Sequence, residues 1–254
     1  MIEVFQISAL NDNYIYIIID KKTGKSACVD PSVSDPVLSF LKKKDLRLDF
    51  ILNTHHHYDH VGGNLELKKQ TNCKIVGNEK DKHRIPGIDI FVNNNEVLKI
   101  GASEALVFDI PGHTIGHICY FFSKDLSLFC GDTLFSLGCG RMFEGNSKQM
   151  SNSLKKIRAL PDKTLIYCGH EYTESNASFA LKLEPENKGL QKKVKEIKSM
   201  RQKRKPTVPS LLIEEKKYNP FLRFDDSDYL SIIGMRDLSY LEAFGKIRKM
   251  KDNF

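Results

Sequence analysis

Four histidines and one aspartate lie within seven consecutive residues, in the segment THHHYDH at residues 54–60. Imidazole nitrogens and carboxylate oxygens are the ligands that zinc and similar divalent ions take in proteins. A surface cluster of histidines is the alternative. However, this segment is internal and directly follows LDFILN at residues 48–53, which has the pattern of a buried strand. The segment therefore predicts a metal site.

The other histidines of the chain support this interpretation. Seven of the eight histidines lie in three short segments, at residues 54–60, 110–117 (IPGHTIGH) and 169–171 (GHE). A further segment, CGDTLF at residues 130–135, ends an apolar run with an aspartate in the same manner. Each candidate ligand ends a predicted strand or lies in the loop after it, where functional sites on sheets are common. The candidate ligands are His55, His57, Asp59, His60, His113, Asp132 and His170.

This set of five histidines and two aspartates is too large for one tetrahedral ion. It suits two ions that each keep one position open to solvent. From an extended backbone His55 and His57 can point the same way, and Asp59 and His60 follow as the chain turns into a helix. Asp132 offers two oxygens and can bridge two cations. We therefore predict two divalent ions per chain, with Zn²⁺ preferred and Fe or Mn as alternatives.

Two cations about 3.5 Å apart suit hydrolysis, because water held between them loses a proton near neutral pH and the hydroxide attacks a carbonyl or phosphoryl group. No GxSxG segment and no Cys/His dyad motif provides a nucleophile of another kind. The chain also has no GxGxxG segment and no P-loop, which argues against a nucleotide cofactor. Among the neighbours of the ligands, we expect His56 to point away from the ions, and His117 and Thr114 to support the ligands or form a turn rather than bind metal.

The elements that must position these residues are short strands and helices. Strands are predicted over residues 3–7, 14–20, 26–30, 50–53, 74–77, 105–110, 118–122, 127–130 and 164–168, because these runs are apolar or β-branched and end at turn residues. Helices are predicted over residues 35–43, 63–70 and 147–159, with Asp35 and Ser147 as N-caps, Pro36 at the first helical position, and the turn after the histidine cluster becoming helical near Val61. This mixture predicts a layered α/β domain.

The character of the sequence changes after His170. Helices are predicted over residues 174–183, 187–204 and 226–250, the last in one or two pieces, with an extended linker at 207–224. We therefore predict a catalytic domain at residues 1–170 and a small helical domain at residues 171–254. Residues 188–205 hold nine basic residues and one acid, with Leu190, Val194, Ile197 and Met200 at helical spacing. An ordinary solvated basic face is favoured there over a nucleic-acid site, because no aromatic residues or recognition motif accompany the charge.

Composition limits the class of protein further. At 254 residues and a net charge of +7, the chain can bury a full core, and no apolar run approaches the roughly 18–20 residues of a membrane span. The N-terminus lacks the pattern of a secretory signal, and the six cysteines show no CxxC or framework spacing. We therefore expect a cytoplasmic protein with reduced, buried thiols, monomeric, and without membrane or nucleic-acid partners.

The motifs resemble those of the metallo-β-lactamase superfamily. The segment at 54–60 is similar to its T-H-x-H-x-D-H signature, and the segments around His113, Asp132 and His170 look like its other ligand motifs. Further segments resemble one branch, the glyoxalase II (hydroxyacylglutathione hydrolase) family. These segments are NDNY at 11–14, GCGRMFEG at 138–145, TVPS at 207–210, NPFLR at 219–223 and the ending RKMKDNF at 248–254. The resemblance covers essentially the whole chain.

The resemblance implies an αββα sandwich with a helical C-terminal domain, and hydrolysis of S-D-lactoylglutathione to glutathione and D-lactate, the second step of methylglyoxal detoxification. It implies that His55, His57 and His113 hold one metal ion, that Asp59, His60 and His170 hold the other, and that Asp132 bridges them. The hypothesis for catalysis is that Asp59 and Asp132 are the catalytic carboxylates, with Asp59 both binding metal and orienting the hydroxide. For glutathione binding, the resemblance implies Arg141, Phe143, Tyr172, Arg248 and Lys251. Phe143 stands where the family commonly has tyrosine, and Arg141 where it commonly has lysine.

Two alternative functions remain at this stage. A glutathione persulfide dioxygenase of the same superfamily would use one iron ion, but it would typically lack the long helical C-terminal part. A nucleic-acid-processing metallohydrolase is suggested only by the basic helix at 188–205. Arg248 and Lys251 share a helix face at i, i+3, although spacing alone favours a frayed basic C-terminus.

Overall fold

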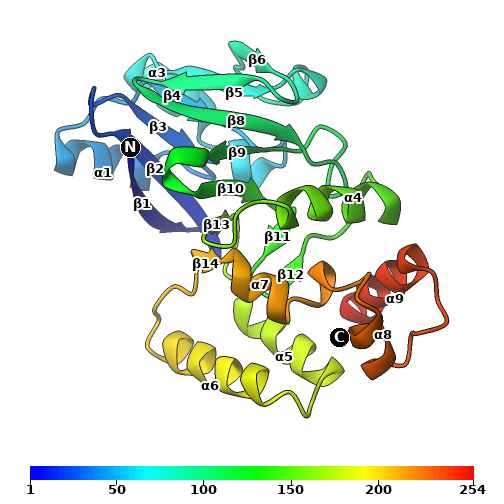
Figure 1. Cartoon of the computed structure of the whole chain (residues 1–254). Coiled ribbons are helices and arrows are strands. Elements are labelled where there is room, and N and C mark those ends of the chain that lie inside the picture. The colour runs from blue at the N-terminus through cyan, green and yellow to red at the C-terminus, as the bar shows by residue number, and fades with distance from the viewer. The chain divides into compact units, whose positions relative to one another are not determined.

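The first sheet forms from the N-terminal third of the chain, where short apolar runs alternate with turn residues. The computed structural model, which describes all 254 residues, divides into an N-terminal unit of residues 1–109 and 114–131 and a C-terminal unit of residues 110–113 and 132–254. In the N-terminal unit six strands follow one another in sheet order β1-β2-β3-β4-β5-β6 (Figure 1). Their bounds are β1 Ile2–Ala9, β2 Asn13–Asp20, β3 Ser26–Val29, β4 Phe50–Leu52, β5 Lys74–Asn78 and β6 Ile90–Val92. The first three strands pair antiparallel, and β3 to β6 pair parallel.

A second, antiparallel sheet in the N-terminal unit packs on the first. It runs in the order β10-β9-β8-β7, with β7 Val97–Ile100, β8 Ser103–Asp109, β9 Ile118–Phe122 and β10 Ser127–Gly131. The rings of Tyr16 on β2 and Phe129 on β10 lie 5.5 Å apart, so the two sheets share a core. Two short 3₁₀ turns, η1 Glu79–Asp81 and η2 Ser123–Asp125, belong to this unit.

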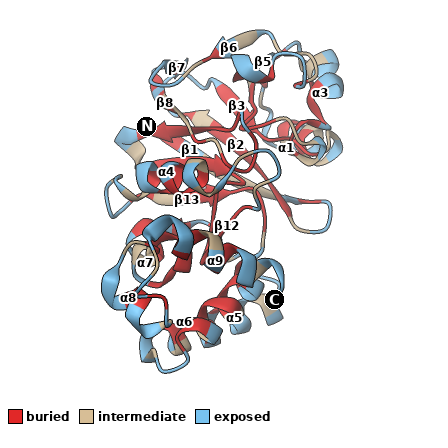
Figure 2. Ribbon diagram, turned by 90° about the vertical axis from the view of Figure 1, so that its right-hand side faces the viewer, coloured by how far each residue is buried: buried red, intermediate tan, exposed pale blue.

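Helices α1 (Asp35–Lys44) and α3 (Asn64–Thr71) cover the outer face of the first sheet. Val37 and Leu41 of α1 and Leu67 of α3 belong to one buried apolar cluster with Ile17 and Ile51 of the sheet. Figure 2 shows inner strands such as β2 and β3 buried, whereas the helices carry both buried and exposed residues. The sheet-end loops are thus attached to a rigid core, as a site on a sheet requires.

The C-terminal unit is mainly helical. Its hairpin strands are β11 Leu134–Phe135 and β12 Gly138–Cys139, and β13 Leu165–Cys168 pairs antiparallel with β14 Ser210–Leu211. Its helices are α4 Ser147–Arg158, α5 Thr173–Leu183, α6 Lys188–Gln202, α7 Leu212–Tyr218, α8 Ser227–Ile232 and α9 Tyr240–Asp252, with a 3₁₀ turn η3 at Pro220–Leu222. None of the helices is both long and apolar enough to cross a membrane.

Most of the predicted elements are confirmed, with ends that differ by one or two residues. The predicted extended linker at 207–224 is wrong, because α7 and η3 occupy residues 212–222. The prediction also missed β6, β7, β11, β12 and β14, which are strands of two to four residues. Strands this short carry too few residues to show a periodicity.

The predicted N-caps were wrong by one residue, and the predicted start of the helical turn after the histidine cluster was wrong by three residues. The N-cap of α4 is Asn146 rather than Ser147, because Asn146 Oδ1 accepts from the N–H of Gln149, and Gln149 Oε1 accepts from the N–H of Asn146. This reciprocal pair is a capping box. The N-cap of α1 is Ser34 rather than Asp35, so Pro36 stands second in the helix. The helical turn in the histidine segment, α2, starts at Tyr58 rather than near Val61.

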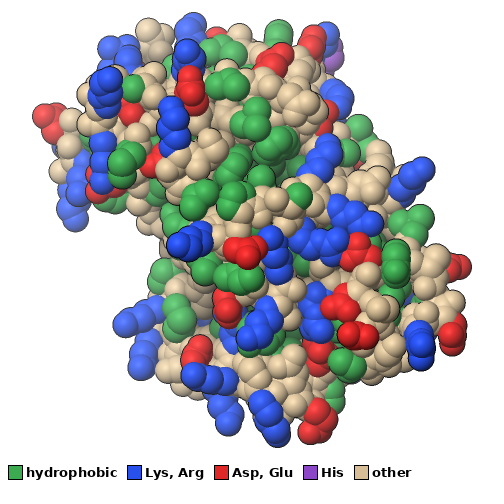
Figure 3. Space-filling view, in the orientation of Figure 1, with side chains coloured by type: hydrophobic (Ala, Val, Ile, Leu, Met, Phe, Trp, Pro, Cys, Tyr) green, Lys and Arg blue, Asp and Glu red, His purple; other side chains and the backbone are tan.

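The predicted basic helix is α6, and its apolar face is partly as expected. Leu190, Val194 and Ile197 are buried, whereas Met200 is exposed. Lysine and arginine side chains lie over α6 on the face seen in Figure 3, mixed with acidic ones. Lys193 pairs with Glu214 at 3.1 Å, and Arg201 pairs with Glu171 at 3.4 Å.

Candidate metal centre

Asp30 and His60 lie side by side at the ends of two parallel strands. Asp30 follows β3, and the histidine segment follows β4, its parallel neighbour. His60 Nδ1 lies 3.0 Å from Asp30 Oδ2, and Asp30 also accepts from the backbone N–H of Thr54 (2.8 Å) and the hydroxyl of Thr54 (2.6 Å). Because an ionised carboxylate only accepts, Nδ1 of His60 carries the proton and Nε2 keeps its lone pair for a metal ion.

Two of the predicted histidine ligands of the N-terminal unit, His57 and His60, lie next to the third, His55. The ring centroid of His55 lies 4.7 Å from that of His57 and 4.2 Å from that of His60. His55 Nδ1 lies 3.1 Å from the Thr54 hydroxyl. His55 and His60 are almost fully buried, at 0% and 1% exposure, which is typical of metal ligands and unusual for isolated histidines.

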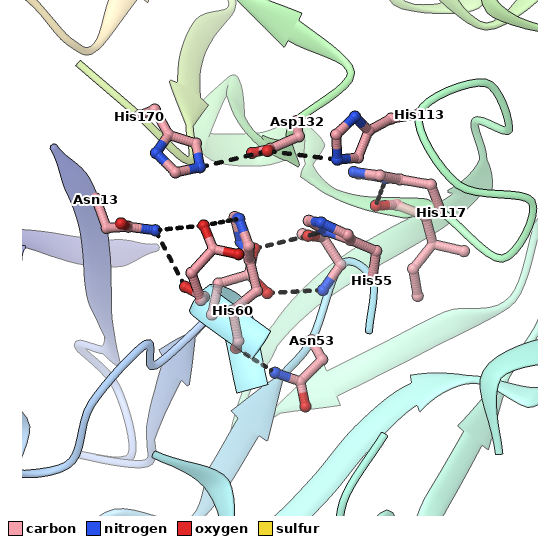
Figure 4. Close-up of polar contacts among 12 residues, drawn as sticks. Asn13, Asn53, His55, His60, His113, His117, Asp132 and His170 are labelled. Carbon is pink, nitrogen blue, oxygen red and sulfur yellow. Dashed lines mark hydrogen bonds and ion pairs between the residues drawn. The ribbon is translucent and has the colours of Figure 1, made fainter. Parts of the chain in front are cut away.

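Asp59 is held by an amide from the first hairpin. Asn13 Nδ2 donates to Asp59 Oδ2 and to the Asp59 carbonyl, each at 3.1 Å (Figure 4). The same Oδ2 lies 3.5 Å from His60 Nε2. Asn13 belongs to the NDNY segment noted in the sequence, although its contact with Asp59 was not predicted.

His56 and His117 lie as the sequence suggested. His56 turns to Asp81, with Nδ1 3.3 Å from Oδ2 of that buried carboxylate, which also accepts from Arg84. His117 is fully buried and stacks on the ring of His55, with centroids 4.6 Å apart and planes 16° apart. Gly131, at φ +48°, leaves room behind these residues, since a Cβ there would lie 2.2 Å from the Thr54 hydroxyl.

The C-terminal unit brings together the other three predicted ligands. Asp132 Oδ2 lies 3.5 Å from His113 Nε2 and 3.3 Å from His170 Nε2, and all three residues are buried (Figure 4). His113 Nδ1 lies 2.8 Å from the carbonyl oxygen of Arg141. A carbonyl only accepts, so Nδ1 of His113 carries the proton and its Nε2 is available to a metal ion.

The donor spacing in both units fits a divalent ion. Metal–nitrogen and metal–oxygen bonds of about 2.0–2.1 Å at tetrahedral angles separate neighbouring ligand atoms by about 3.3–3.4 Å. The contacts of Asp132 with His113 and His170, and of Asp59 with His60, lie at 3.3–3.5 Å. A donor set of imidazole and carboxylate with this spacing indicates divalent metal ions.

Thiolate ligands are not part of this set. All six cysteines are free and buried, as predicted. Burial raises the pKa of Cys139 to about 11 and that of Cys168 to about 12. Both side chains therefore stay as neutral thiols near neutral pH.

The five predicted glutathione-binding residues all belong to the C-terminal unit. Arg141 is exposed and Phe143 is 63% exposed, with its ring 5.2 Å from that of His113. Tyr172 stacks on His170 with a centroid distance of 4.7 Å and parallel planes. Two exposed aromatic rings thus lie against two buried metal-ligand candidates.

The two basic residues of α9 differ in their surroundings. Arg248 is buried, donates to the Cys139 carbonyl at 2.8 Å and pairs with Asp252 at 3.0 Å. Lys251 donates to the Ser175 hydroxyl at 2.9 Å. Its pKa is lowered by partial burial and by the nearby charges of Arg248 and Arg141.

Both parts of the chain match models of known protein families. The model of the metallo-beta-lactamase superfamily matches residues 11–170, and that of the hydroxyacylglutathione hydrolase C-terminus matches residues 171–254. Two proteins named hydroxyacylglutathione hydrolase, from Methylococcus capsulatus and Rhodospirillum rubrum, are each 48% identical to this chain over 100% of it and 99% of their own lengths. The chain belongs to the hydroxyacylglutathione hydrolase family.

Solved structures show the fold of this hydroxyacylglutathione hydrolase family member. The chain is similar to the BLEG-1 B3 metallo-beta-lactamase, with a TM-score of 0.66 and 22% identity over 87% of this chain and 99% of that one. It is similar to ETHE1 from Myxococcus xanthus, with a TM-score of 0.67 and 24% identity over 97% of this chain and 96% of that one. The predicted metallo-β-lactamase fold with a helical C-terminal part is confirmed. The C-terminal match also favours the predicted hydrolase over the dioxygenase alternative.

Several residues at this centre were missed from the sequence. Asp30 ends a strand just as Asp132 does, so the criterion applied to Asp132 would have found it. Asp81 lies in a charged, polar-looking stretch, and nothing in the sequence indicates that its carboxylate is fully buried. The Arg141 carbonyl is a backbone group, which no side-chain pattern reveals.

Proposed function

We propose that this protein hydrolyses S-D-lactoylglutathione to glutathione and D-lactate, the second step of methylglyoxal detoxification. The observation that carries this proposal is the match of the hydroxyacylglutathione hydrolase C-terminus to residues 171–254. The histidine motif alone is common to a superfamily with many reactions. Full-length relatives that are 47–48% identical and carry the hydrolase name give further support.

The proposed metal centre uses all seven predicted ligands. His55, His57 and His113 would hold one ion, Asp59, His60 and His170 would hold the other, and Asp132 would offer oxygens to both, with Zn²⁺ as the preferred metal. The protons on Nδ1 of His60 and His113 support this assignment, because they place the lone pair of each ring on Nε2, the atom that would bind metal. When bound, such a pair of ions lowers the pKa of water and stabilises the charge on the oxygen of an attacked carbonyl.

The chain's own residues would orient the reaction. The amide of Asn13 holds Asp59 Oδ2 at 3.1 Å, so that carboxylate has one fixed direction in which to orient the attacking oxygen. A thiol has a pKa of about 8.5, so glutathione leaves as the thiolate without a dedicated general acid. This fits two of its histidines, because His60 already donates its proton to Asp30 and His113 donates its proton to the Arg141 carbonyl.

Recognition of glutathione would depend on the basic residues and aromatic rings of the C-terminal unit. Arg248 already faces the Cys139 carbonyl and Asp252, whereas Lys251 has a lowered pKa beside two other cations. A substrate carboxylate near Lys251 and Arg141 would relieve this repulsion. Phe143 and Tyr172 would flank the thioester arm.

We further propose the setting expected from the sequence. The catalytic domain would comprise residues 1–170 and the glutathione-binding domain residues 171–254. The protein would act in the cytoplasm as a monomer on a small-molecule substrate, without nucleic-acid or membrane partners. The ion pairs of α6 with Glu214 and Glu171 support an ordinary basic surface there.

The decisive experiment assays the purified chain with S-D-lactoylglutathione and measures its metal content by elemental analysis. We expect release of glutathione together with about two divalent ions per chain. An Asp59→Ala variant serves as the site control and should lose most of kcat. Full metal content without hydrolysis would reject the substrate, and oxygen uptake with glutathione persulfide would favour the dioxygenase.

A further inference from the structure

A short hairpin connects two parts of the proposed centre in the C-terminal unit. Strands β11 and β12 lie between Asp132 and Arg141 in the chain. At the base of the hairpin, Gly140 N–H donates to the Thr133 carbonyl at 3.2 Å, and the Arg141 carbonyl accepts from His113 Nδ1 at 2.8 Å. The position of this hairpin therefore determines where Asp132 and His113 can lie.

The tip of the hairpin is bound by two side chains from a distant segment. Glu215 Oε2 accepts from the backbone N–H of Leu137 at 2.7 Å. Asn219 Nδ2 donates to the carbonyls of Phe135 (3.2 Å) and Gly138 (3.0 Å). Glu215 and Asn219 are both 0% exposed, so these hydrogen bonds are shielded from competing water.

The orientation of the Asn219 amide is fixed by its own neighbours. Its Oδ1 accepts from the N–H of Phe221 at 3.0 Å, which leaves Nδ2 as the donor towards the hairpin. Nδ2 also donates to Glu215 Oε2 at 3.0 Å. Glu215 in α7 and Asn219 at the end of α7, spaced i, i+4, thus form one hydrogen-bonded pair.

The backbone at the tip needs such support. Leu137 has a φ of +57°, a left-handed conformation that costs a non-glycine residue on the order of 1 kcal/mol or more. Its side chain is fully buried, and its N–H is the group that Glu215 accepts. A strained turn of this kind persists only where its surroundings hold it.

We propose that Glu215 and Asn219 are positioning residues for the metal centre, acting through the β11–β12 hairpin on Asp132 and His113. This inference rests on the metal roles proposed above for those two residues. It also gives a role to the NPFLR segment at 219–223, which neither metal binding nor glutathione binding explains. Neither Glu215 nor Asn219 would touch metal or substrate.

The geometry identifies variants that separate this role from simple stability. The N–H of Leu137 and Nδ2 of Asn219 both donate to Oε2 of Glu215. The single amide oxygen of a Glu215→Gln variant can therefore accept both hydrogen bonds. Glu215→Ala removes the acceptor. Asn219→Asp keeps an oxygen that can accept the N–H of Phe221. It loses the hydrogen bonds that Nδ2 donates to the Phe135 and Gly138 carbonyls, and it places a second carboxylate against Glu215.

The first test measures Zn²⁺ affinity of the full chain by competition with a chelator, below the melting temperature of every variant. We expect Glu215→Ala and Asn219→Asp to weaken the binding of at least one ion roughly tenfold, the low end for residues that support metal ligands. Glu215→Gln should bind nearly as tightly as the unmodified chain. Asp225→Ala is the control, because it removes the ion pair with Arg158 in the same unit without touching the hairpin.

Two results of this test would overturn the proposal. One is unchanged Zn²⁺ affinity in Asn219→Asp and Glu215→Ala. The other is an equal loss in Asp225→Ala at a matched fall in Tm. Because affinity is measured without substrate, failure to hydrolyse S-D-lactoylglutathione would reject the proposed function and leave this test intact.

A second measurement uses the unmodified protein and remains decisive if the variants fail to fold. Hydrogen exchange at the Leu137 amide is followed before and after the metal is removed with a chelator. We expect that amide to remain as protected as the strands of the core, because its hydrogen bond to Glu215 does not involve the metal ligands. Exchange as fast as that of exposed loops after metal removal would show that the metal holds the hairpin, and would overturn the proposal.

Discussion

His60 Nδ1 lies 3.0 Å from Asp30 Oδ2, with the two residues 1% and 3% exposed. The same carboxylate accepts both the backbone N–H and the hydroxyl of Thr54, the first residue of the histidine segment. Asp30 therefore joins the ends of two parallel strands and fixes which nitrogen of His60 carries the proton. A buried carboxylate behind an imidazole is a common support for metal-binding histidines.

An Asp30→Ala variant should lose metal affinity by about 10- to 100-fold, because His60 loses both its tautomer and its orientation. Chelator competition with Zn²⁺ measures this loss directly. Asp20→Ala provides a matched control, since Asp20 is an equally buried carboxylate of the same unit that accepts from Thr23 and Ser103 instead. Equal Zn²⁺ affinities in the two variants would show that Asp30 only stabilises the fold.

Gly140→Ala should reduce kcat/KM by on the order of 100-fold, the effect of displacing a catalytic group by about 1 Å. A Cβ at Gly140 would lie 1.9 Å from the Asp132 carbonyl oxygen and 3.1 Å from His113 Nδ1, so the backbone must move. Gly245→Ala in α9 is the control, because its Cβ meets only the Ser147 hydroxyl at 3.3 Å. That variant should keep its activity. Activity of Gly140→Ala equal to that of Gly245→Ala would refute the prediction.

The sequence predicted the fold best where the chain itself shows a period. Strands such as Asn13–Asp20 and helices such as α6 are long enough to display alternation or a helical apolar face. Helix α7 was missed because Pro206, Pro209 and Pro220 surround it and its seven residues include four charged ones. From the sequence, Glu215 of this helix is expected at the surface. Only the fold shows that it is buried and accepts a hydrogen bond from the N–H of Leu137.

The candidate site was predicted residue by residue only where side-chain type limits the chemistry. Histidines and aspartates that gather at strand ends are typical of metal binding or catalysis, so candidate ligands could be named in each unit. Groups that support them were not found, since a carbonyl such as that of Arg141, or an amide such as that of Asn13, has no distinctive sequence pattern. Contacts of this kind depend on pairings between residues far apart in the chain.

Glu215 should make the stability of the protein depend on pH. Burial raises the pKa of its carboxyl above the usual 4.5, although hydrogen bonds from Leu137 and Asn219 oppose the shift. The folded state therefore holds a proton that the unfolded state has released, and its contribution to stability is present below pH 4.5 and is lost as pH rises through the folded pKa. Glu215→Gln cannot ionise and keeps the acceptor oxygen.

We expect the difference in free energy of unfolding, Glu215→Gln minus the unmodified chain, to become more positive as pH rises from 4.5, and then to level off. Urea unfolding at a series of pH values measures it, and Asp225→Asn is the control for a carboxylate whose pKa is shifted the other way. A difference that stays constant across this range would mean that Glu215 titrates normally.

Phe143→Tyr should strengthen substrate binding. Phe143 is 63% exposed and lies beside the ring of His113, at a position where the family resemblance implies a tyrosine. A restored hydrogen bond of about 0.5–1.5 kcal/mol would lower KM for S-D-lactoylglutathione by about two- to twelvefold. The value of kcat should stay the same, because the hydroxyl would bind the peptide part of the substrate rather than the reacting carbonyl. Steady-state kinetics measure both constants, and Phe91→Tyr adds the same hydroxyl to another exposed ring, on β6. A KM equal to that of Phe91→Tyr, or a fall in kcat, would count against a role for this position in glutathione binding.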